Sequence, residues 1–134
     1  MRFAGSLDAN VLLRFILGDV ESQSKAAISL LESSHGQLAV ADQAFVEVVF
    51  VLEKGYEMAR ADIVAALEGI ISLPVINCNR ALLSTALPHY LRSPALSFVD
   101  CCLATYADLN DAAPLYTFDR KLANQLPSAK LLVS

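Results

Sequence analysis

The chain has 134 residues and 55% hydrophobic residues, so it is long enough for one domain with a buried core. Charged residues interrupt each apolar run before it reaches the roughly 18 residues of a membrane span, and we expect no signal peptide. The net charge of −4 argues against tight non-specific binding of nucleic acid by the chain alone, because such binders carry a basic surplus.

The three cysteines, Cys78, Cys101 and Cys102, lack the spacing of a zinc site and the number expected of a disulfide framework. We interpret them as small apolar residues of a reduced, cytoplasmic protein. The apolar fraction is above the usual share, which favours an unusually buried sheet or an apolar surface kept for a partner.

Strands and helices are predicted to alternate along the chain. The first strand ends at Asp8, and the other predicted strands cover 38–40, 75–77, 115–118 and 130–133. The predicted helices cover 11–17, 22–33, 44–54, 61–73, 80–92, 97–109 and 119–125. This alternation predicts an α/β fold with a mainly parallel sheet in a single domain over residues 1–134, with the first strand near its centre.

Local signals set several of the expected helix boundaries. Ser22 or Ser24 is expected to cap the second helix, and Asp42 the third. Apolar residues recur with a helical period in 61–73, which makes this segment the clearest helix. Pro88 lies inside the helix over 80–92 and is expected to kink or split it.

Four acids stand out by their positions. Asp8 and Asp119 directly follow predicted strands, whereas Glu47 and Asp100 lie near the starts of predicted helices. Chemistry in open α/β sheets gathers outside the carboxyl ends of the strands. We therefore expect these acids to converge at one rim of the sheet, with Asn10 beside Asp8.

Each acid also has a structural interpretation. Asp8 and Asp119 could cap the helices that follow them, and Asp100 completes an S-x-x-D capping box with Ser97. Glu47 is harder to explain in this way, because its neighbours are apolar and burying a lone carboxylate costs several kcal/mol. Its structural alternative is a rim position from which the carboxylate reaches water.

Four converging carboxylates require a counter-charge. Two unit charges about 4 Å apart repel by roughly 4 kcal/mol at an effective dielectric near 20. Oxygen ligands without histidine or cysteine favour Mg²⁺ or Mn²⁺ over zinc. A cation of this kind supports hydrolysis of phosphodiester bonds.

Four segments, taken in order, resemble PIN-domain ribonucleases of the VapC type, the toxin half of bacterial toxin–antitoxin pairs. They are LDANVLL with Asp8 and Asn10, FVEVVFVL with Glu47, LSFVDCCLATYA with Ser97 and Asp100, and LYTFDRKLA with Asp119. No single motif is specific, but the four together span almost the whole chain with fitting spacing.

The resemblance implies helices sandwiching a parallel sheet of about five strands, and an endoribonuclease that depends on Mg²⁺ or Mn²⁺. It implies that Asp8, Glu47, Asp100 and Asp119 are the acidic catalytic and metal-site residues, with Asn10 and Ser97 as polar supports. It also implies an RNA substrate, a homodimer, and a cognate antitoxin whose tail covers an apolar groove and the acidic site.

Two positions depart from the family pattern. Ala9 stands where the family commonly has threonine or serine, and Pro88 stands where similar chains carry a continuous helix. Because Ala9 lacks this hydroxyl group, a non-catalytic binding module that keeps the PIN scaffold is an alternative interpretation. A phospho-acceptor receiver domain is a further alternative, but Ala9 replaces its second acid and Asn77 ends the third strand.

Overall fold

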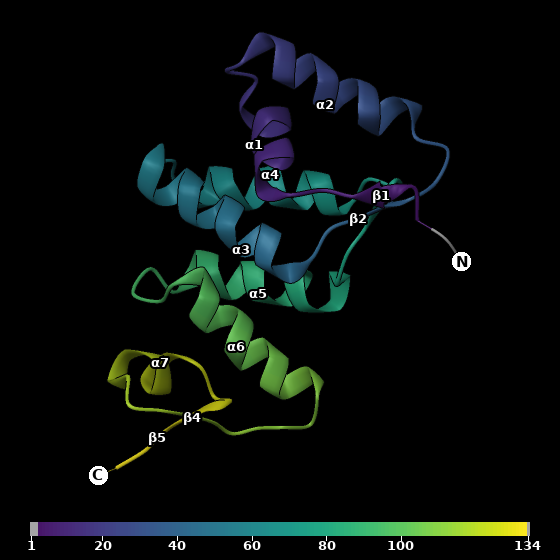
Figure 1. The fold of residues 1–134 in the computed structure, drawn as a ribbon. Helices are drawn as coiled ribbons and strands as arrows, with labels where there is room; N and C mark the ends of the chain where they lie inside the picture. Colours follow the sequence, from purple (N-terminus) through teal and green to yellow (C-terminus); the bar gives the residue numbers. More distant parts are fainter. Residues whose placement is uncertain (1–2, 134) are drawn as a thin grey trace. The chain divides into compact units, whose positions relative to one another are not determined.

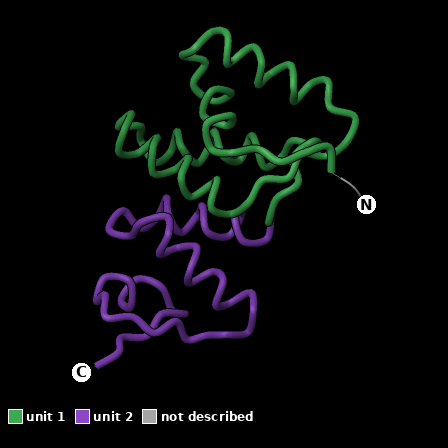
Figure 2. Tube along the Cα trace, viewed as in Figure 1, with its two compact units in different colours: residues 1–79 green, residues 80–134 purple. Residues whose placement is uncertain are grey.

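The protein is described by a computed structural model that covers residues 3–133. The chain divides into two compact units, unit 1 up to Asn79 and unit 2 from Arg80 (Figure 2). Among residues 3–133, no helix has both the length and the apolar character that crossing a membrane requires.

Unit 1 is an α/β unit with a three-stranded parallel sheet in the order β1-β2-β3. Figure 1 shows β1 and β2 side by side. Its elements are β1 (Gly5–Ser6), α1 (Ala9–Leu17), α2 (Glu21–Ser33), β2 (Leu38–Ala39), α3 (Asp42–Phe50), η1 (Val51–Gly55), α4 (Arg60–Ile71) and β3 (Ile76–Asn77). In the central strand, Leu38 lies opposite Gly5 on one side and Ile76 on the other.

The core of unit 1 comes from apolar side chains that recur with the period of each helix. In α4 the predicted face is confirmed, since Ile63, Val64, Leu67, Ile70 and Ile71 are all buried. The other large buried side chains of unit 1 include Leu12, Leu13, Phe45, Val48, Val49, Leu52 and Ile76.

A π-helical turn, η1, extends α3. The N–H of Tyr56 donates to the carbonyl of Val51 at 3.2 Å, a hydrogen bond that spans five residues. The single helix predicted over 44–54 is therefore two consecutive segments, α3 and η1. Asp42 is the first residue of α3 and not its cap, which is Ala41.

Unit 2 combines a pair of helices with a small parallel sheet. Its elements are α5 (Arg80–Arg92), α6 (Phe98–Leu109), β4 (Leu115–Thr117), α7 (Arg120–Gln125) and β5 (Ala129–Leu131). The rings of Tyr90 in α5 and Phe98 in α6 meet edge to face, with centroids 5.6 Å apart. β4 and β5 pair in parallel, with Leu115 opposite Ala129, and α7 packs against both strands.

All five predicted strands are found, but the single five-stranded sheet and the central first strand are wrong. The strands form one sheet of three and one of two, and β1 lies at an edge. The composition of β1 suits an edge position. Gly5 and Ser6 are both exposed, and their small side chains would bury little apolar area if β1 had a neighbouring strand on each side.

Two expectations about helix boundaries are also wrong. Of the two effects expected of Pro88, the split does not occur, because α5 continues from Arg80 to Arg92 with buried side chains on both sides of the proline, Leu87 and Tyr90 among them. Neither Ser22 nor Ser24 caps α2. Its N-cap is Val20, which makes no side-chain capping bond.

Candidate active site

Asp8 joins the end of the first strand to the start of α1. Its Oδ1 accepts a hydrogen bond from the N–H of Val11 at 3.0 Å, so Asp8 is the N-cap of a helix that begins at Ala9, two residues before the predicted start. The carboxylate is exposed. The capping interpretation is thus confirmed, and an exposed carboxylate also has oxygen available for a ligand.

Ala9 follows directly as the first residue of α1. Its methyl group is buried, with 4% of the residue exposed. The position at which the family commonly has a hydroxyl residue is therefore filled here by a packed apolar side chain.

A groove between α1 and α2 has Asp8 and Asn10 in its wall. Its volume is about 570 Å³, within the range of roughly 300–1,000 Å³ typical of ligand sites. The lining residues are Asp8, Asn10, Val11, Arg14, Gln23, Ala26, Ala27 and Leu30. The structure therefore places two of the predicted site residues, Asp8 and Asn10, in one concave surface.

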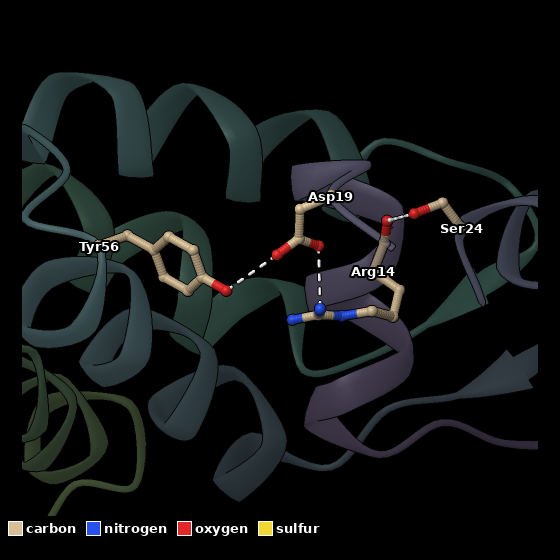
Figure 3. Close-up of polar contacts among 4 residues, drawn as sticks. All are labelled: Arg14, Asp19, Ser24 and Tyr56. Atoms are coloured by element: carbon tan, nitrogen blue, oxygen red, sulfur yellow. Dashed lines mark hydrogen bonds and ion pairs between the residues drawn. The ribbon is translucent and has the colours of Figure 1, made fainter. Parts of the chain in front are cut away.

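Arg14, which the sequence interpretation left out of the site, belongs to a polar network beside this groove. Its Nη1 lies 2.9 Å from Oδ1 of Asp19, and the hydroxyl of Tyr56 donates to Oδ2 of Asp19 at 3.0 Å. Figure 3 shows Arg14 and Tyr56 both reaching the Asp19 carboxylate. The spacing of Arg14, one helical turn after Asn10, is a sequence signal that could have identified it.

Ser24 fixes the same region from α2. Its hydroxyl donates to the backbone carbonyl of Arg14 at 2.9 Å, and the serine is buried with 6% exposed (Figure 3). The N–H of Gly18 donates to the same carbonyl at 3.1 Å. The end of α1 is thus fixed both by its C-cap and by the neighbouring helix.

Glu47 lies on α3 and is exposed, so the burial suggested by its apolar neighbours is wrong and its carboxylate reaches water, as in the structural alternative. Phe45, Val48 and Val49 are buried, whereas Glu47 is exposed. Its carboxylate reaches water and pays no burial cost, so its environment alone does not require a cation. Glu47 does not line the groove that contains Asp8.

In unit 2, Ser97 and Asp100 lie together at the start of α6. The Oγ of Ser97 accepts a hydrogen bond from the N–H of Asp100 at 3.1 Å, which confirms Ser97 as the cap. Asp100 is half-buried in the first turn, where the helix dipole favours a negative charge.

Asp119 is the N-cap of α7. Its Oδ1 accepts hydrogen bonds from the N–H groups of Lys121 at 2.9 Å and Leu122 at 3.3 Å. Its own N–H donates to the hydroxyl of Thr117 at 3.0 Å. The capping interpretation is confirmed for this acid too, and its carboxylate is exposed.

The four acids divide between the units, with Asp8 and Glu47 in unit 1 and Asp100 and Asp119 in unit 2. Within either unit, the described residues contain no group of three or more His, Cys, Asp or Glu side chains that could hold a metal ion. The convergence of all four stays a prediction. The carboxylate oxygens of these exposed or half-buried acids are hard ligands, which suit a hard divalent cation such as Mg²⁺ or Mn²⁺.

Comparison with protein families identifies a match over most of the chain. A family model described as "PIN domain" matches residues 6–125, a range that contains all four acids and extends into both units. No curated protein matches the chain.

Proposed function

Because the chain belongs to the PIN domain family, a nuclease superfamily whose members typically depend on divalent metals, we propose that it is an endoribonuclease dependent on Mg²⁺ or Mn²⁺. The observation that carries the proposal is the family match itself, because all four acids lie within it. The match crosses the boundary between the units, which supports one functional domain over residues 1–134.

In this proposal the four acids form one site, and Asp8 and Asp100 are the main ligands of a divalent cation. Glu47 and Asp119 bind it directly or through water, and Asn10 and Ser97 support their neighbours. A cation held by these residues would supply a nucleophilic water and would stabilise the charge that develops on the phosphate. The exposure of Asp8, Glu47 and Asp119 supports this role, because exposed carboxylates are accessible to ligands.

The experiment that tests the proposal is cleavage of total RNA and of labelled single-stranded RNA in Mg²⁺, Mn²⁺ or EDTA. We expect cleavage with either metal, none in EDTA, and none in the Asp100→Asn variant. Asp108→Asn is the matched control, since Asp108 is an exposed acid on the same helix. A folded wild type that cuts no RNA with either metal would instead support a non-catalytic binding module.

We further propose that the protein is the toxin of a bacterial toxin–antitoxin pair, acts in the cytoplasm, forms a homodimer and is silenced by a cognate antitoxin. The four motifs and the high apolar content support this reading. Expression in a bacterial host should stop growth, and co-expression of the protein from the neighbouring gene should restore it. If Asp100→Asn stops growth equally, the toxicity does not come from the acidic site.

A further inference from the structure

We propose that the groove between α1 and α2 holds the RNA strand beside the bond that is cut, and that Arg14 contacts a phosphate of that strand. The inference rests on the proposed ribonuclease function and extends it to a residue outside the acidic set. Three features of unit 1 support it. Asp8 and Arg14 line the same groove, the guanidinium of Arg14 is held in place, and the other residues that line the groove suit RNA.

The groove contains Asp8, one of the four acids, together with Arg14. Asp8 and Arg14 both line it, and six positions on one helix separate them by about 9 Å at 1.5 Å of rise per residue. A strand with a phosphate at Asp8 would therefore run along α1 and bring a neighbouring phosphate towards Arg14.

Arg14 is held in a way that suits it to bind an anion. The Asp19 carboxylate is fixed by the Tyr56 hydroxyl and in turn orients the guanidinium, whose side chain is 17% exposed (Figure 3). The guanidinium has five N–H donors in a rigid fork, so one pairing with a carboxylate leaves donors for a phosphate.

The other lining residues suit single-stranded RNA. The amides of Asn10 and Gln23 can bond to base edges, and the apolar side chains of Val11, Ala26 and Leu30 offer a surface for a base. The antitoxin tail that the family resemblance implies would also cover an apolar surface beside the acid, so it would compete for this groove. The guanidinium of Arg14 and the amides of Asn10 and Gln23 along one groove are features that a nucleic-acid strand uses as well. RNA is therefore the occupant that the lining favours.

The test measures binding of a short labelled single-stranded RNA that the wild type cleaves. All variants carry Asp100→Asn, which lies outside this groove, so that the RNA stays intact, and Mg²⁺ is held constant while the salt concentration is varied. We expect Arg14→Gln to weaken binding by roughly ten- to a hundredfold. We also expect the slope of log affinity against log salt to fall by about 0.7, the value for one lost phosphate contact.

The matched control is Lys25→Gln, which removes one positive charge from α2 at a position outside this groove. We expect Lys25→Gln to change the affinity and the salt slope less than Arg14→Gln does. Gln23→Ala serves as a second variant, since Gln23 is exposed and its loss leaves the fold intact; it should alter the preference among RNA sequences.

The outcomes separate this inference from the proposed function. If the wild type cleaves RNA and Arg14→Gln, folded by circular dichroism, keeps the parent's affinity and salt slope, the inference is wrong and the ribonuclease stands. If Arg14→Gln fails to fold, Gln23→Ala decides the question. The inference is wrong if Gln23→Ala prefers the same RNA sequences as its parent. If the variants lose binding only to the purified protein from the neighbouring gene, the groove is a protein-docking surface. If the wild type cuts no RNA, the proposed function fails first.

Discussion

At the level of single residues, Asp8 combines a capping bond with the proposed chemistry, and two substitutions can separate these roles. Asparagine caps a helix about as well as aspartate, whereas alanine costs about 1 kcal/mol of stability. We expect Asp8→Asn to abolish RNA cleavage without loss of stability, and Asp8→Ala to abolish cleavage and also unfold at a lower denaturant concentration. Urea denaturation beside the cleavage assay measures both effects. Full activity in Asp8→Asn would remove Asp8 from the site.

Ser24 is the second residue whose contribution can be isolated. Its buried hydroxyl bonds to the Arg14 carbonyl, and a hydrogen bond of this kind contributes about 1 kcal/mol. Ser29 lies on the same helix and is exposed, so Ser29→Ala matches the change in helix propensity. We expect Ser24→Ala to be less stable than Ser29→Ala by about 1 kcal/mol in urea denaturation. Equal stability would mean that water replaces the bond.

Glu47 shows how far single residues could be predicted from the sequence. The apolar neighbours suggested burial, but the buried residues recur at Phe45, Val48, Val49 and Leu52, which is a helical stripe that leaves Glu47 outside. The stripe was present in the sequence, and the error came from counting neighbours along the chain without their positions around the helix. The helical spacing of Arg14 after Asn10 is also present in the sequence, but the groove that Arg14 lines forms only because α2 lies beside α1.

At the level of elements, substitutions of Gly18 and Gly69 test how much backbone conformation contributes to stability. Gly18 ends α1 with a φ of +62°, and Gly69 lies inside α4; a Cβ added at either meets no atom within 4 Å. We expect Gly18→Ala to destabilise the protein by about 1 kcal/mol and Gly69→Ala to stabilise it by a similar amount. Thermal and urea denaturation of both variants provide the measurement. A stabilising Gly18→Ala would contradict the left-handed C-cap.

The positions of all five strands and most helices could be predicted, because hydrophobic period and turn residues are local signals. The π turn could not, since it depends on hydrogen bonds that reach five residues along the chain and is followed by the contact of Tyr56 with Asp19. The continuity of α5 through Pro88 was missed because burial on both sides of the proline is a property of the packed unit. The sheet order was missed because strands of two or three residues carry little pairing information.

At the level of the whole molecule, the proposed site links metal binding to stability. A ligand that binds only the folded state stabilises it by about 2.7 kcal/mol at a hundredfold excess over its dissociation constant. We expect Mg²⁺ and Mn²⁺ to raise the melting temperature of the wild type above its value in EDTA, and to raise that of Asp100→Asn much less. Differential scanning fluorimetry provides the comparison. An equal rise in Asp100→Asn would place the bound metal elsewhere.

The division of the acids between two compact units has a consequence for thermal inactivation. Partial openings of a protein cost less free energy than complete unfolding, and an opening of either unit would withdraw two of the four acids from the proposed site. Activity should therefore disappear on heating before the helices melt. Residual RNA cleavage measured at each temperature, beside the circular dichroism signal of the helices, should show inactivation several degrees below the main transition and reversal on cooling.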